Sequence, residues 1–261
     1  MPLKPNFTRV KEPRGFIKII EFLIAILAFS TTAGYNSEFK VSLSFNCGEG
    51  TDSQTVLATF GYSFSKYKTS IGGVECTTNP PPLPAGANGE VGLPSSLKSS
   101  SEFFVFVGAI SFLYCIGAMV YYVCFEDPAK YGPGGTGRDI KSFATVDFAV
   151  TVLLTLFWFC ASTAWAAGLS KLKDKTDAGD FCQSLRDKGV IAPCSVTDKA
   201  NYAGITISVL FGFLCCFLWG ANVWFVFKET VWHKEPEATI TAEQPESEIP
   251  RQEVPGKEAV P

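Results

Sequence analysis

Four stretches of the chain are apolar and long enough to cross a lipid bilayer, and this feature limits the possible folds more than any other. A hydrocarbon core of roughly 30 Å requires about 20 apolar residues in a helix, because a helix pairs its own backbone polar groups. The sequence therefore predicts an all-α membrane fold, a bundle of four membrane-spanning helices. We expect the spans at residues 16–33, 103–125, 146–169 and 203–227.

The composition agrees with a membrane protein and argues against two other classes. Of the 261 residues, 47% are hydrophobic. The net charge of −3 and the lack of a basic patch interleaved with aromatic residues make nucleic acid an unexpected partner. The segments between the spans are short, and they contain no phosphate-binding glycine loop, nucleophile elbow or histidine metal motif. We therefore expect neither enzyme activity nor a cofactor.

Cysteine pairs occur in two of the three predicted loops, and these two loops alternate along the chain. The pairs are Cys47 and Cys76 in residues 34–102, and Cys182 and Cys194 in residues 170–202. Disulfides form in oxidising compartments, so both loops are expected on the lumenal or extracellular side. Four cysteines allow three pairings. Closure of each loop on itself is the simplest, and free thiols are the alternative.

Four spans place both termini on the same side of the membrane. Because the cysteine-bearing loops are expected on the lumenal side, the termini are expected in the cytosol. We expect a cytosolic N-terminus at residues 1–15, a membrane domain at 16–230 and a disordered cytosolic tail at 231–261. Basic residues before the first span support this orientation, whereas those in residues 170–202 oppose it. An alternative treats residues 1–33 as a cleaved signal peptide, and Glu21 inside the apolar stretch argues against it.

Part of the first loop has the alternating pattern of strands. Residues 40–45 and 55–64 alternate apolar and polar side chains, which predicts short strands. A small disulfide-tied β element on the lumenal side is therefore expected.

Polar residues inside the predicted spans are the candidate functional residues. Glu21 and Asn222 lie within hydrocarbon, where an ionisable or amide group must find a partner. A hydrogen bond between helices, with Asn222 as one partner of Glu21, is the structural interpretation. Partner recognition or an ion path is the functional one. We expect Lys18 to reach the cytosolic headgroups and Asp147 to cap the third helix.

Lipid contacts give two further candidates. Lys18, Phe22 and Leu27 fit a loose cholesterol-contact pattern, and Cys124 lies where a membrane span ends, a position typical of palmitoylation. Small residues such as Gly108, Gly117 and Gly212 are expected to pack the helices together. An outward face that drives oligomerisation is the alternative.

Six segments, in unbroken order along the chain, share a family pattern. They are Lys-Glu-Pro-Arg-Gly-Phe-Ile-Lys at 11–18, Ala-Thr-Phe-Gly-Tyr-Ser-Phe at 58–64, Ser-Ser-Ser-Glu-Phe-Phe at 99–104, Ser-Thr-Ala-Trp-Ala at 162–166, Phe-Gly-Phe-Leu at 211–214, and Trp-Gly-Ala-Asn-Val-Trp-Phe-Val-Phe-Lys-Glu-Thr at 219–230. These segments resemble the family of synaptophysin, synaptoporin, pantophysin and mitsugumin. The resemblance covers residues 11–230. It implies a MARVEL-type four-helix fold, cytosolic termini and residence in small secretory or synaptic vesicles.

The same resemblance implies three kinds of partner: further copies of the chain, cholesterol and the vesicle SNARE synaptobrevin.

The chain also departs from the family pattern at several positions. Cys215 and Cys216 follow Phe-Gly-Phe-Leu where an Asn is common, and the tail lacks the Tyr-Gly repeats of synaptophysin. These departures favour a pantophysin-like or mitsugumin-like member. The expected function is structural, in membrane organisation and vesicle trafficking. A channel or transporter, and a junctional tetraspan, are the alternatives.

Overall fold

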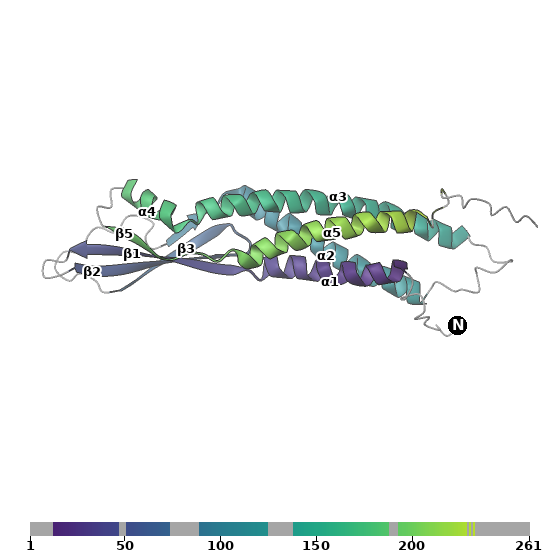
Figure 1. The fold of residues 1–261 in the computed structure, drawn as a ribbon, viewed down its shortest axis with the longest axis horizontal. Coiled ribbons are helices and arrows are strands. Elements are labelled where there is room, and N and C mark those ends of the chain that lie inside the picture. Colours follow the sequence, from purple (N-terminus) through teal and green to yellow (C-terminus); the bar gives the residue numbers. More distant parts are fainter. Residues whose placement is uncertain are drawn as a thin grey trace, which may run out of the picture.

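Four long helices form a bundle, and a β-sheet extends from one end of it (Figure 1). The computed structural model describes residues 13–46, 51–73, 89–124, 138–187, 193–228, 230 and 232. The helices of the bundle are α1 (Pro13–Ala33), α2 (Ser95–Cys124), α3 (Arg138–Lys175) and α5 (Ala203–Phe227). The end of the bundle that carries the sheet is called the sheet end, and the opposite one, where α1 begins and α5 ends, is the terminal end.

The four helices form a closed ring. Both α1 and α3 pack against α2 and α5, so that α1 and α3 lie diagonally opposite. Each helix is long and apolar enough to cross a membrane. The predicted fold class, a four-helix membrane bundle, is therefore confirmed. Helix α1 packs between α2 and α5 as a full member, with Ala25 and Ala28 completely buried, which opposes the signal-peptide alternative.

Two helices extend well beyond the predicted spans. Helix α2 begins at Ser95, where polar residues precede the apolar stretch and Lys98 and Glu102 form an i,i+4 ion pair. Helix α3 has 38 residues and is therefore about 57 Å long, roughly twice the hydrocarbon thickness. Hydropathy detects only the part of a helix that must be apolar. It therefore misses a polar extension in which the helical backbone hydrogen bonds continue beyond the membrane.

The two cysteine-bearing loops fold together into one sheet. Its five strands, in the order β4-β3-β2-β1-β5, are all antiparallel. Their bounds are β1 (Asn36–Asn46), β2 (Thr51–Gly61), β3 (Lys66–Gly73), β4 (Gly89–Gly92) and β5 (Cys194–Asp198). Strand β5 comes from the loop between α3 and α5, whereas the others come from the loop between α1 and α2. Both loops thus lie on one side of the bundle, and the β element is larger than the predicted pair of short strands.

One face of the sheet is apolar because alternate residues of its strands point the same way. Phe39, Val41 and Leu43 of β1 are fully buried there. The short helix α4 (Ala178–Asp187) covers part of this face, and the ring centroid of Phe181 lies 5.6 Å from that of Phe39. A disulfide between Cys182 and Cys194 joins α4 to β5. Cys47 and Cys76, the other predicted pair, lie outside the described residues.

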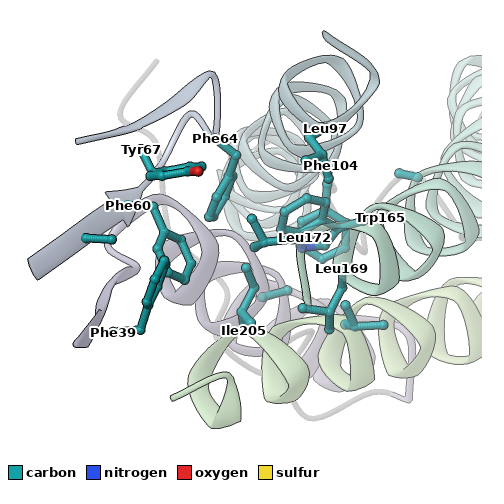
Figure 2. Packing of buried hydrophobic residues seen from close by; sticks show 14 of the residues in the cluster. Phe39, Phe60, Phe64, Tyr67, Leu97, Phe104, Trp165, Leu169, Leu172 and Ile205 are labelled. Atoms are coloured by element: carbon teal, nitrogen blue, oxygen red, sulfur yellow. The ribbon is translucent and has the colours of Figure 1, made fainter. Parts of the chain in front are cut away.

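Aromatic side chains join the sheet to the bundle in one continuous core (Figure 2). The ring centroids of Phe64, in the β2–β3 turn, and Trp165, on α3, are 5.1 Å apart. Tyr35 donates a 2.7 Å hydrogen bond to the carbonyl of Asn201, and Tyr202 shares one of the same length with Thr176. Burial raises the pKa of the Tyr35 and Tyr202 hydroxyls. The sheet is therefore fixed to the helices at their ends.

Gly212→Ala should destabilise the bundle by about 1–3 kcal/mol, since overpacking a filled core forces neighbours apart. A Cβ at Gly212 would lie 2.5 Å from Phe104 Cε2 and 2.6 Å from Ser162 Oγ. Gly117→Ala is the matched control, because nothing lies within 4 Å of a Cβ there. Denaturant unfolding of the purified protein in micelles measures both variants. Equal stability of the two would contradict this account of the packing.

Replacement of Cys182 and Cys194 together by Ser should loosen α4 and β5 while leaving the bundle intact. Closing this loop, with a sequence separation of 12, contributes about 3 kcal/mol in the chain-entropy model. Hydrogen exchange should become faster in α4 and β5 and stay unchanged in the four long helices. Cys160→Ser, at an exposed free thiol of α3, is the control. Unchanged exchange in α4 would show that packing on the sheet alone holds that helix.

Candidate functional site

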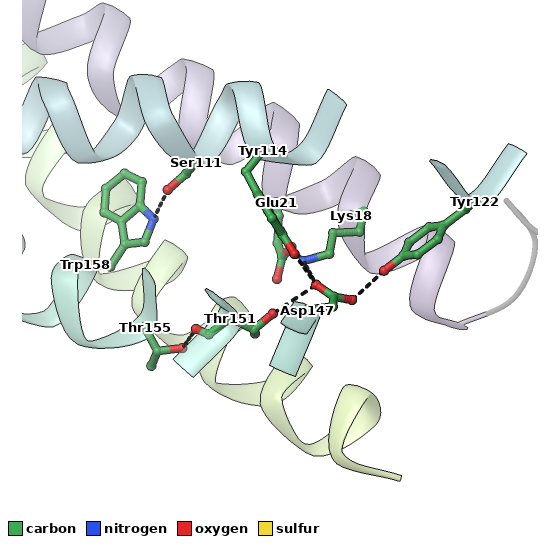
Figure 3. Close-up of polar contacts among 9 residues, drawn as sticks. All are labelled: Lys18, Glu21, Ser111, Tyr114, Tyr122, Asp147, Thr151, Thr155 and Trp158. Carbon is green, nitrogen blue, oxygen red and sulfur yellow. Dashed lines mark hydrogen bonds and ion pairs between the residues drawn. The ribbon is translucent and has the colours of Figure 1, made fainter. Parts of the chain in front are cut away.

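A cluster of charged and polar side chains is enclosed between the helices, toward the terminal end of the bundle (Figure 3). All four long helices contribute to this charged cluster. Its members are Lys18 and Glu21 from α1, Tyr114 and Tyr122 from α2, Asp147 and Thr151 from α3, and Trp219 and Asn222 from α5. The side chains of Lys18, Glu21 and Asp147 have no solvent exposure.

Lys18 is the cation of the cluster. Its Nζ lies 3.1 Å from Glu21 Oε2 on the same helix and 4.0 Å from Asp147 Oδ1 across the bundle. The ammonium also faces two aromatic rings, at 4.3 Å from the centroid of Trp219 and 5.1 Å from that of Tyr114. A cation over an aromatic face is attracted to it most strongly where water is excluded. Lys18 is thus held by contacts to all three other helices.

Asp147 is the best-paired carboxylate. Tyr114 donates a hydrogen bond of 2.5 Å to Asp147 Oδ1, and Tyr122 donates one of 2.6 Å to Oδ2. Thr151, one turn along α3, lies 3.4 Å from Oδ1 as a further donor. The two tyrosines are eight residues apart and lie on one face of α2. Each carboxylate oxygen therefore has its own tyrosine donor from the neighbouring helix.

Glu21 and Asn222 are paired less well. Asn222 lies beside Glu21, yet neither carboxylate oxygen of Glu21 and neither polar atom of the Asn222 amide has a hydrogen bond of normal geometry. The close contact of Glu21 with Lys18 is an ion pair whose heavy-atom angles are not those of a hydrogen bond. Unsatisfied polar atoms in a low-dielectric interior are costly, by about 1–3 kcal/mol each. The α5 side of the cluster is its least satisfied part.

The chain matches the family model described as the MARVEL membrane-associating domain over residues 9–225. It belongs to this family. The match includes the whole of α1, α2, α3 and the sheet, and nearly all of α5, so the charged cluster and the sheet both lie inside the MARVEL domain. The family shows a multi-pass, membrane-associated protein, in agreement with the four apolar helices.

Two predictions about charged residues of this MARVEL domain are wrong. Lys18 was expected to reach the headgroups, but it is buried under Trp219 because two carboxylates inside the bundle attract it. Asp147 was expected to cap the third helix, but α3 begins at Arg138, so Asp147 lies in its third turn and points inward. Both errors come from treating a charge near the end of a span as belonging to the interface.

The predicted cholesterol contact does not form one lipid-facing motif. Lys18 is fully buried, Phe22 stacks on Phe112 of α2, and only Leu27 is substantially exposed. The pattern therefore lacks its basic residue at the surface. Cys124 is the last residue of α2, partly exposed and free, and its palmitoylation stays a prediction.

Tyr114, Tyr122 and Trp219 are site residues that the sequence analysis did not identify. The sequence contained part of the evidence for these residues, since both tyrosines lie on one face of a predicted span and Asp147 lies just inside another.

An open cavity of about 370 Å³ lies at the turn between β2 and β3, lined by Tyr35, Tyr62 and Lys66 among others. It contains none of the predicted site residues. Among the described residues, no group of His, Cys, Asp or Glu is placed to hold a metal ion.

Lys18→Met should be strongly destabilising, by about 3–5 kcal/mol, because it leaves two buried carboxylates without their cation. Lys98→Met is the control, since Lys98 is half exposed and pairs with the half-exposed Glu102. Exposed ion pairs contribute at most about 1 kcal/mol, so the control should behave like the wild type. Unfolding in micelles compares the two variants. A small effect at Lys18 would mean that the cluster does not hold the helices together.

Proposed function

We propose that this MARVEL protein is a structural and trafficking protein of small secretory or synaptic vesicles. It organises the vesicle membrane and holds partner membrane proteins against its transmembrane surface. The mechanism is lateral association, without a chemical step. The MARVEL family match places the chain in a membrane. The segments that resemble the synaptophysin family support the vesicle as its location.

One observation carries this proposal: the bundle encloses Lys18, Glu21 and Asp147 and presents large apolar side chains outward on all four helices. They include Phe16 and Leu23 of α1, Phe106 and Leu113 of α2, Leu156 and Phe159 of α3, and Leu210 and Phe217 of α5. Such a surface can contact lipid or the apolar face of another membrane helix. Helix association in lipid depends on close packing of such faces.

The proposed orientation puts the sheet in the lumen and both termini in the cytosol. The disulfide between Cys182 and Cys194 supports it, because such a bond persists in an oxidising compartment. The sheet then projects from the lumenal side, and the charged cluster lies toward the cytosolic side. The proposed partners are further copies of the chain, cholesterol and synaptobrevin, because the resemblance to the synaptophysin family implies them.

A channel or transporter is the second candidate, and the charged cluster is the observation that favours it. Charged residues within spans commonly mark ion paths. In this bundle, however, Lys18, Glu21 and Asp147 are fully enclosed, and the core beyond the cluster is filled by Trp158 and Trp165. Conduction through one subunit would require these side chains to move apart. The membrane-organising function fits the packed interior better.

Immuno-isolation of small vesicles from cells that express the tagged chain tests the proposal. We expect the protein to be enriched with synaptobrevin and to migrate differently on reduced and non-reduced gels. The Cys182→Ser/Cys194→Ser variant is the control for mobility, since it lacks one lumenal disulfide.

Three other outcomes would count against the proposal. A surface distribution concentrated at cell contacts would favour a junctional tetraspan. A plasma-membrane distribution without vesicle enrichment would contradict the vesicle location. Voltage-driven current in bilayers that changes in Glu21→Gln would favour the channel.

A further inference from the structure

The charged cluster contains an unequal number of positive and negative groups. Several titratable side chains from the four helices face one another there. They are Lys18 and Glu21 of α1, Tyr114, Cys115 and Tyr122 of α2, Asp147 of α3, and Cys215 of α5. Among these described residues, Lys18 is the one basic group and Glu21 and Asp147 are the two acids. With all three ionised, the enclosed cluster carries a net charge of −1.

An uncompensated charge in an apolar interior is very costly, and a buried group is usually neutralised instead. The two carboxylates differ in the hydrogen bonds that stabilise their charged forms. Asp147 accepts a hydrogen bond from a tyrosine hydroxyl on each of its oxygens, an arrangement that stabilises a carboxylate. Glu21 has no aligned donor on either oxygen. Glu21 is therefore the acid that gains more from binding a proton.

Asn222 provides a partner for that proton. Its amide lies beside Glu21, and its carbonyl oxygen accepts no hydrogen bond. A protonated Glu21 can donate its O–H to this oxygen, which would satisfy two polar atoms that are otherwise unpaired. Lys18 would then be free to pair with Asp147, whose Oδ1 lies 4.0 Å from the ammonium, compared with 3.1 Å for Glu21 Oε2.

We propose that the charged cluster is a proton-binding site, in which Glu21 takes up one proton from bulk solvent and Lys18 then pairs with Asp147. The carboxylate becomes a carboxylic acid, and the cluster changes from a net charge of −1 to neutral. No other group changes its charge. This goes beyond the proposed function, because it concerns a ligand bound inside the bundle and not the partners on its surface.

Proton binding would act on the contact between diagonal helices. Helices α1 and α3 each pack on α2 and α5, so Lys18 and Asp147 form a link across the ring. With Glu21 ionised, the ammonium is shared between a residue of its own helix and one of α3. With Glu21 protonated, the ion pair joins α1 to α3 alone. The protonated state is the one that holds the four helices most tightly.

Infrared difference spectroscopy of the full chain in lipid nanodiscs, across a pH series, tests this proposal. The C=O stretch of a protonated carboxyl group should be present in the wild type around neutral pH and be lost at alkaline pH. Labelling all glutamates with ¹³C at the side-chain carboxyl should shift this band, whereas the same label in aspartates should not. The band should be lost in Glu21→Gln and kept in Glu102→Gln, at a half-exposed glutamate of α2.

Asp147→Asn provides a second variant. It leaves Lys18 and Glu21 to neutralise each other, so the proposal expects the band to be lost there too. A band that shifts with labelled aspartate would place the proton on Asp147 and overturn the assignment. So would the persistence of the band in Glu21→Gln or Asp147→Asn, or its absence from the wild type at every pH at which the protein is folded.

Thermal unfolding against pH gives an independent measurement. If the folded protein still holds at neutral pH a proton that a glutamate of the unfolded chain has already released at lower pH, stability must fall as pH rises until the folded protein also releases that proton. The midpoint of the wild type should therefore decrease between neutral and alkaline pH by more than that of Glu21→Gln. Parallel curves for the two proteins would overturn the proposal, because the vesicle function alone predicts no such difference.

Discussion

The ion pairing of Lys18 with Glu21 and Asp147 is the interaction on which the arrangement of the bundle depends. Apolar side chains give little preference for one helix neighbour over another in lipid, because the hydrocarbon is as apolar as they are. A buried charge does give that preference, because it is stable only beside a group of opposite charge. Lys18 fixes α1 against α3 in this way, and the tyrosines of α2 fix that helix against Asp147. The charged cluster therefore determines the register of the helices.

The sheet fixes the other end by different means. Strand β1 follows α1, strand β5 precedes α5, and the two strands pair in one ladder. This ladder holds the sheet-end termini of α1 and α5 together. The aromatic contacts between Phe64 and Trp165 then extend the apolar core of the bundle into the sheet. Loops that a hydropathy analysis treats as connections thus form part of the packed structure.

The sequence predicted the four helices because a bilayer demands length and apolar composition, and both are visible in a single chain. It predicted α5 almost without error, because that span has no polar extension. It could not predict the pairing of β1 with β5, which joins segments about 150 residues apart and depends on the closed ring of helices. The role of Asp147 was missed for a related reason. Whether a charge near the end of a span faces headgroups or the interior depends on the neighbouring helices, and Tyr114 and Tyr122 belong to another part of the chain.

A bundle held from inside leaves its outer surface free for other contacts. The cluster holds the helices at one end, the sheet holds them at the other, and between them Trp158 donates a hydrogen bond to Ser111 while Gly212 lets Phe104 and Ser162 approach α5 closely. None of these contacts uses the outward apolar side chains such as Leu113 and Phe217, which are more than 60% exposed. A partner helix or a lipid can therefore bind there without competing with the contacts that maintain the fold. Proton binding inside and partner binding outside would act on different residues of the same four helices, so each can be altered separately by mutation.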